Sequence, residues 1–149
     1  MPRTKQRRLH LELDPPVRIQ VGRHQLTFIG LTLLNRVTMV EYVADPPLAP
    51  FYPFRPAFDL QVTDDTDAMP YPTDWENLGR PELGPGRTTT HLDQRPPPDA
   101  TTLQFVVRPS AEAEACGAFE VSLPSEHAAP WRPGHPSEER ARTSVAAQI

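Results

Sequence analysis

An acidic cluster near the middle of the chain contains the residue types of a calcium site. The stretch TDDTDAMPY places Asp64, Asp65 and Asp67 close together, and a calcium site needs several oxygen atoms that converge in one loop. Met69 and Pro70, however, stand where an EF-hand loop would have a ligand and then a glycine. We therefore predict a turn between two strands in which the aspartates accept hydrogen bonds from nearby backbone groups, with no bound metal or cofactor.

The histidines are scattered and lack the spacing of a metal site, and the only cysteine, Cys116, cannot form an intrachain disulfide. His91 and Asp93 would share one face of a strand, and such a pair could orient an imidazole for base catalysis with Ser122 or a threonine as the nucleophile. No nucleophile elbow or glycine-rich oxyanion loop accompanies the pair in the sequence. We predict an exposed strand pair and no catalytic residue.

A second route to catalysis would bring carboxylates together across the fold. Glu12, Glu41 and Asp59 would support a two-carboxylate hydrolase only if the fold placed two of them on either side of a substrate. Sequence spacing does not decide this. A hydrolase or metal-dependent enzyme built on a β-sandwich therefore stays the alternative to a non-catalytic protein.

A regular proline spacing distinguishes the stretch DPPLAPFYPFRPAFDL. Its prolines recur at every third position, which matches the three residues per turn of a polyproline II helix: Pro47, Pro50, Pro53 and Pro56. The same spacing puts Leu48, Phe51 and Phe54 on one apolar edge. We expect this edge to bury against the domain, because a small domain depends on such apolar area.

A long loop and the outward edge of the proline-rich segment supply the candidate binding residues. The loop NLGRPELGPGR is followed by a polar strand, so it lacks the helix N-terminus of a phosphate cradle. Loops of this length are frequently binding loops, and Trp75 and Arg80 lie just before and within it. Tyr52 and Arg55 are of the types that concentrate at binding hot spots. These four residues form the predicted binding surface, and the predicted partner is another protein.

Several segments alternate apolar and polar residues with period two, which is typical of half-buried strands. This pattern predicts four strands with inward-facing residues: Val17, Ile19 and Val21; Phe58, Leu60 and Val62; Leu103, Phe105 and Val107; Phe119, Val121 and Leu123. The polar segment RTTTHLD predicts an edge strand.

The longest apolar segment, residues 25–44, predicts two central strands. It is apolar on both sides, too long for one strand and without helical periodicity, so we divide it at a tight turn near Asn35 and Arg36. The parity of its apolar positions changes at Gly30, which predicts a β-bulge there.

Composition divides the chain into three parts. We predict that residues 1–16 are a basic flexible arm, residues 17–124 a β-sandwich domain, and residues 125–149 a proline-rich disordered tail. Within the tail, only PSEERARTSVAAQI could form a short terminal helix.

Charge and hydropathy argue against several kinds of partner. The net charge of -4 offers no general attraction to nucleic acid or to an anionic membrane, and the few basic residues of the arm would give only weak, salt-sensitive phosphate contacts. The sequence contains no apolar h-region at its start and no run that is long enough to span a bilayer. We expect a cytoplasmic protein.

The succession of strand and turn sequences also resembles that of a known class of proteins. The segments LTFIGLTLLNRVTMVEYV, FDLQVTDD, PPPDATTLQFVV and FEVSLP are similar to those of uncharacterised immunoglobulin-like bacterial proteins. The resemblance implies an immunoglobulin-like fold over roughly residues 17–124. Together with the strand pattern and the composition of the ends, it predicts an all-β protein, namely a single immunoglobulin-like antiparallel β-sandwich of about seven strands with disordered termini. It implies no activity, ligand or site residue. We expect a non-catalytic protein-interaction or accessory module.

Overall fold

The fold is an all-β sandwich, as the sequence predicts. The structure is a computed structural model that describes residues 8–46, 58–74, 87–128 and 138–148. Its elements are β1 (Arg8–Val21), β2 (His24–Leu34), β3 (Val37–Asp45), β4 (Asp59–Asp64), β5 (Thr73–Asp74), β6 (Arg87–Leu92), β7 (Thr102–Arg108), β8 (Gly117–Ser122), the 3-10 turn η3 (Ser125–Ala128) and β9 (Glu138–Gln148). All seven strands that the residue pattern predicts are present among them.

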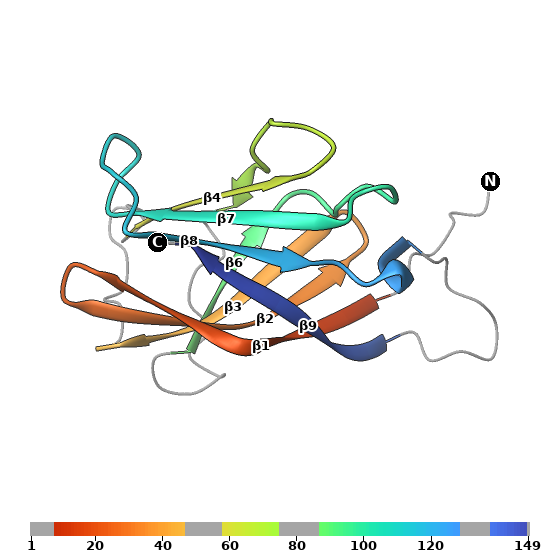
Figure 1. Ribbon diagram of the computed structural model, residues 1–149, viewed down its shortest axis with the longest axis horizontal. Coiled ribbons are helices and arrows are strands. Elements are labelled where there is room, and N and C mark those ends of the chain that lie inside the picture. The colour runs from red at the N-terminus through yellow and green to blue at the C-terminus, as the bar shows by residue number, and fades with distance from the viewer. Residues whose placement is uncertain (1–7, 47–57, 75–86, 129–137, 149) are drawn as a thin grey trace.

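Hydrogen bonding joins these strands in the order β4-β7-β8-β9-β1-β2-β3-β6-β5. The sheet folds over on itself, so that β4, β7 and β8 lie across from β1, β2, β3 and β6 (Figure 1). The neighbours pair antiparallel with one exception, the parallel pair of β1 and β9. Strand β9 pairs with β1 over residues 138–144 and with β8 over residues 145–148, so it is the strand that connects the two layers.

The predicted inward faces form the core. Every inward-facing residue of the four alternating strands is buried, and aromatic rings join the layers at the centre. Phe119 of β8 stacks on Phe105 of β7 with ring centroids 4.6 Å apart, and it also contacts Phe28 of β2 at 5.1 Å. Tyr42 of β3 lies between Phe28 and Phe58. Phenylalanines from opposite sheets therefore meet directly, which is the packing that a sandwich requires.

The β-bulge predicted at Gly30 is confirmed. The pairing of β2 with β3 changes register between Phe28 and Gly30. A Cβ atom at this position would lie 3.2 Å from the Leu11 carbonyl oxygen and 3.3 Å from Cε1 of His10. Glycine therefore allows β1 and the His10 ring to approach β2 closely at the bulge.

The prediction of a flexible arm up to residue 16 is wrong for residues 8–16, which belong to β1. Leu9, Leu11 and Leu13 are at most 2% exposed, because RLHLELD alternates in the same way as the other strands. The following prolines suggested the end of an arm. In the structure they lie where the pairing of β1 with β2 shifts register, between Glu12 and Val17, and irregular positions of this kind tolerate proline.

The prediction of a disordered tail is wrong for residues 125–128 and 138–148. Residues 125–128 form η3, where His127 is 4% exposed, and residues 138–148 form β9 instead of the proposed helix. The sequence EERARTSVAAQ has few large apolar residues and therefore no strong strand pattern. It forms a strand because β1 and β8 both present backbone groups to it. The domain thus extends on both sides of residues 17–124.

Close packing at Gly117 gives a first testable result. A Cβ atom at Gly117 would lie 3.1–3.2 Å from three side-chain carbons of Ile19 in β1. We expect Gly117→Ala to lower the free energy of unfolding by about 1–2 kcal/mol, because overpacking outweighs the entropy that alanine removes from the unfolded chain. Chemical denaturation measures the loss. In an Ile19→Val background the same substitution should cost less, and an equal cost in both backgrounds would contradict the proposed contact.

Candidate functional site

The sandwich has two ends, and their connections differ. The end that we call the Asp64 end contains the β2–β3 turn, the turn after β4, residues 93–101 and η3. The opposite end, which we call the β3–β4 end, contains the β1–β2 turn, the end of β3, the beginning of β4 and the β7–β8 connection (Figure 1). The strand pairing supports this division. Asp45, the last residue of β3, is opposite Gln25 near the beginning of β2, and Arg87, the first residue of β6, is opposite Val43, so these strand ends lie together at the β3–β4 end.

The acidic cluster forms the turn after β4, as predicted. Oδ1 of Asp64 accepts hydrogen bonds from the backbone N–H groups of Thr66, at 2.7 Å, and Asp67, at 3.2 Å. Oδ2 accepts one from the buried Tyr71 hydroxyl at 2.6 Å. The backbone of Met69 donates to Asp67 at 3.0 Å. The carboxylates therefore hold the turn itself.

Asp65 has a role that the sequence did not reveal, because it crosses to another connection. Its Oδ1 accepts hydrogen bonds from the backbone N–H of Thr101, at 2.8 Å, and of Thr102, at 3.2 Å, and its Oδ2 accepts one from the Thr101 hydroxyl. This residue fastens the turn after β4 to the beginning of β7. Both carboxylates thus accept hydrogen bonds from the chain itself, and no group of three or more metal-binding side chains occurs within the described part of the chain.

The hydrogen bonds also set the ionisation of both carboxyls. Burial acts to raise the pKa of Asp64, but the hydrogen bonds from Thr66, Tyr71 and Asp67 outweigh it and lower this pKa below its ordinary value. The Thr101 hydroxyl and backbone lower the pKa of Asp65 from 3.8 to about 2. Burial and the neighbouring Asp64 carboxylate raise the pKa of the Tyr71 phenol.

The lowered pKa values predict a loss of stability in acid. A carboxyl whose pKa is lower in the folded protein stabilises the fold above its unfolded pKa, and this contribution disappears as the pH falls through the folded value. For Asp65 that window lies between 3.8 and about 2. We expect the difference in unfolding free energy between the unaltered protein and Asp65→Asn to narrow through this window.

Urea denaturation at a series of pH values measures that difference. Thr101→Val is the matched control: it keeps the carboxyl but removes its hydroxyl donor, so it should flatten the pH dependence of the unaltered protein. If the difference in unfolding free energy between the unaltered protein and Asp65→Asn stays constant from pH 7 down to about pH 2, the proposed role of Asp65 is contradicted.

Arg95 and His127 are both buried at the Asp64 end. Arg95 is 9% exposed and donates from Nη2 to the His127 carbonyl oxygen at 2.9 Å and from Nη1 to the Leu34 carbonyl oxygen at 3.3 Å. Nε2 of His127 lies 2.7 Å from the Ala100 carbonyl oxygen. Burial acts to lower the pKa of Arg95. Sequence reasoning missed both residues, since neither belongs to a motif and His127 was assigned to the tail.

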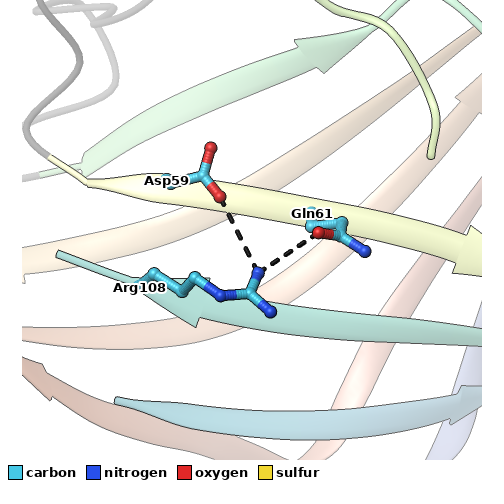
Figure 2. A network of polar contacts seen from close by, with 3 residues as sticks. All are labelled: Asp59, Gln61 and Arg108. Atoms are coloured by element: carbon cyan, nitrogen blue, oxygen red, sulfur yellow. Dashed lines mark hydrogen bonds and ion pairs between the residues drawn. The ribbon is translucent and has the colours of Figure 1, made fainter. Parts of the chain in front are cut away.

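The β3–β4 end presents a guanidinium whose donors are only partly used. Nη1 of Arg108, at the end of β7, donates to Oε1 of Gln61 at 3.2 Å and lies 3.9 Å from Oδ2 of Asp59. The other terminal nitrogen points away from both partners (Figure 2). Gln61 and Asp59, on β4, therefore hold Arg108 in place while leaving donors for a further acceptor.

Other polar and acidic groups also lie at the β3–β4 end. Nδ1 of His24 lies 2.7 Å from the Pro46 carbonyl oxygen, which fixes the chain where it leaves β3. Glu112 and Glu114 are exposed in the β7–β8 connection. At this end the backbone of Pro46 is therefore fixed by a hydrogen bond, and the surface carries the partly exposed Arg108 and the exposed Glu112 and Glu114.

The four predicted binding residues lie outside the described residues, but the chain around them is placed. Tyr52 and Arg55 belong to residues 47–57, and the chain leaves β3 at Pro46 and resumes at Phe58, both at the β3–β4 end. Trp75 and Arg80 belong to residues 75–86, which begin after β5 and rejoin the sheet at this end with Arg87. The apolar edge Leu48, Phe51 and Phe54 also lies outside the described residues.

No family model, curated protein or solved structure matches this chain. Its function is therefore inferred from its own geometry.

The groups considered for catalysis do not meet. His91 of β6 and Ser122 of β8 lie on the outer faces of opposite layers, since their neighbours Leu92 and Val121 are buried. Sheets pack about 10 Å apart, so His91 and Asp93 cannot activate this hydroxyl.

The carboxylates considered for a hydrolase are also separated. Glu12 and Glu41 are the register partners of Gly30 on its two sides, which places their strands about 10 Å apart. Asp59 lies in the other layer beside Arg108. In the described ranges, no helix is long and apolar enough to cross a membrane.

Proposed function

We propose that the chain is a non-catalytic protein-interaction or accessory module with an immunoglobulin-like sandwich, and that it binds its partner at the β3–β4 end. The observation that carries the proposal is the contrast between the two ends. At the Asp64 end, Asp64, Asp65, Arg95 and His127 use their polar atoms in hydrogen bonds to neighbouring groups of the same end. At the β3–β4 end, by contrast, the chain leaves β3 at Pro46, resumes at Phe58 and resumes again at Arg87 after residues 75–86. Binding residues concentrate on long connections when a rigid scaffold positions them.

The chemistry of this end suits a protein surface. Arg108 offers guanidinium donors, and Glu112 and Glu114 offer exposed carboxylates close along the chain. Tyr52 and Trp75 would add the aromatic area that forms the centre of most interfaces. Mixed charges favour a polar protein partner over nucleic acid, which requires a predominantly basic surface.

The experiment compares recovery of a stoichiometric partner by the immobilised full chain and its variants. We expect Tyr52→Ala, Trp75→Ala and Arg108→Gln to reduce recovery without lowering the melting temperature, because none of them removes a residue of the described core. Met69→Ala is the matched control, since Met69 is a large apolar side chain, 69% exposed, at the opposite end. Equal recovery by all variants, or an equal loss with Met69→Ala, would reject the assignment of the β3–β4 end.

A further inference from the structure

Arg108 of β7 keeps one complete edge of its guanidinium group free. Nη1 donates to Oε1 of Gln61 and lies near Oδ2 of Asp59. Within the described part of the chain, Nε and Nη2 have no hydrogen-bond or ion-pair partner, and Figure 2 shows Nη2 pointing away from both neighbours of Nη1. Nε and Nη2 together form the edge on which a guanidinium presents two parallel N–H groups to one acceptor.

The guanidinium is held in place before any partner binds. Asp59 is the register partner of Arg108, and Asp59 and Gln61 lie on the outer face of β4, since Leu60 between them is buried. The Arg108 side chain is 26% exposed, so solvent reaches it although two residues of β4 hold it. A guanidinium that is already held loses less conformational freedom on binding than a free surface arginine.

The side of Arg108 opposite β4 lies near the beginning of β8. The pairing of β7 with β8 reaches only to Val107, which is opposite Gly117. Arg108 is one position beyond this pairing, so no residue of β8 is its register partner. The two layers of partners are therefore unequal: β4 uses Nη1, and β8 places no side chain across from the other edge of the group.

We propose that Arg108 binds a carboxylate of the partner protein through Nε and Nη2 in a side-on, bidentate arrangement. This assignment rests on the proposed function, because it names the chemistry that the β3–β4 end recognises. A carboxylate has two oxygen atoms that match the two parallel N–H groups. A backbone carbonyl oxygen is a single acceptor and would leave one of the two N–H groups without a partner.

The neighbouring carboxylate of Asp59 determines which anion fits best. It lies 3.9 Å from Nη1 and offsets part of the charge of Arg108. Repulsion between Asp59 and a bound anion grows with the charge of that anion, and a phosphate group carries about 1.5 to 2 negative charges at neutral pH. The free edge therefore favours a carboxylate, which carries a single charge.

The expected source of the carboxylate is an acidic side chain of the partner. Capture of a chain terminus ordinarily uses a nest of backbone N–H groups beside the charged residue. The described contacts of Arg108 are with the side chains of Gln61 and Asp59, and they include no such nest. An aspartate or glutamate side chain needs only the bidentate edge that Arg108 offers.

The experiment follows the Nε–Hε resonance of Arg108 in proton–nitrogen correlation spectra of the labelled full chain. The resonance is assigned by its absence from the spectrum of Arg108→Lys. The probes are two tripeptides with blocked ends, glycine-glutamate-glycine and glycine-glutamine-glycine, which differ by one carboxylate. One partly exposed ion pair is weak, so the titration extends to about 100 mM at constant ionic strength. We expect the glutamate peptide to move the resonance downfield in a saturable manner and the glutamine peptide to leave it in place.

Two variants serve as controls in the same titration. Arg108→Lys keeps the charge without the planar fork, so the backbone amide of Gln61 should lose its saturable shift with the glutamate peptide. Arg18→Gln is the matched control, because Arg18 is an exposed strand arginine of β1, in the other layer. It should leave the response of Arg108 unchanged. The remaining amide resonances show whether each variant keeps its fold.

Three results would overturn the proposal. Equal shifts with the two peptides would show that the carboxylate is not the bound group, and tighter binding of inorganic phosphate would contradict the selection by Asp59. Tighter binding of triglycine with a free carboxyl end would contradict the acidic side chain as the source. These titrations contain no partner protein. They can therefore fail while the full chain still recovers a partner, and recovery can fail while Arg108 still binds the glutamate peptide, so the two proposals are tested separately.

Discussion

Phe119→Ala will lower the free energy of unfolding by about 3–5 kcal/mol, the range for removing a phenylalanine ring from a packed core. Phe119 is 1% exposed and touches both layers, stacked on Phe105 with an interplanar angle of 4° and tilted against Phe28. Alanine would leave a cavity that neither strand closes, because β7 and β8 are fixed by their own pairing. Domains are stable by only about 5–15 kcal/mol, so this variant will be near its unfolding threshold at ambient temperature.

Urea denaturation monitored by circular dichroism measures this loss. Phe119→Leu fills most of the same volume and should cost roughly 1–2 kcal/mol, whereas Gln104→Ala, on the exposed face of β7, should change stability by no more than about 0.5 kcal/mol. A loss below 1 kcal/mol for Phe119→Ala would show that the two layers do not meet through this ring.

Arg95→Ala will have the second-largest effect, with a loss of about 2–4 kcal/mol in the free energy of unfolding. The substitution leaves the carbonyl oxygens of His127 and Leu34 without their Arg95 donors, and each unsatisfied buried group costs about 1–3 kcal/mol. It also removes the alkyl stem that packs in the same place. Because the donors connect η3 to the end of β2, we expect the damage to be concentrated at the Asp64 end.

Two further variants separate packing from hydrogen bonding at Arg95. Arg95→Met keeps an apolar stem without donors, and Arg95→Lys keeps one charged donor group without the planar fork. The order of stability should be arginine, then lysine and methionine, then alanine. Hydrogen exchange at the His127 amide, which donates to the Pro124 carbonyl oxygen at 3.0 Å, reports the local effect. If this amide stays as protected in Arg95→Ala as in the unaltered protein, η3 does not depend on the arginine.

Sequence reasoning succeeded where local pattern and burial coincide. Period-two alternation identified β4, β7, β8 and the second half of β1, because in a sandwich the face of each strand is decided by which side chains avoid water. The change of parity at Gly30 located the bulge for the same reason. The turn at Asp64 was also predictable, since aspartate hydrogen bonds to backbone groups two or three residues ahead in the chain.

The candidate site was only partly predictable. The types of residue in the two long connections indicated binding, but the sequence did not show that both rejoin the sandwich at one end. It also gave no signal for Arg108, because an arginine at a strand end becomes a presented donor only when Asp59 and Gln61 of another strand lie beside it.

The sequence by itself determined that this protein is an all-β sandwich and that the inward residues of its four alternating strands belong to the core, because hydrophobic burial acts on each strand through its own alternation. Only the tertiary structure decided that β1 begins at Arg8, that EERARTSVAAQ is a strand, and that Arg95 and His127 are buried. These features depend on what lies beside a segment and not on the segment itself. The open edges of β1 and β8 make β9 a strand, and the carbonyl groups of distant turns make burial of a guanidinium tolerable.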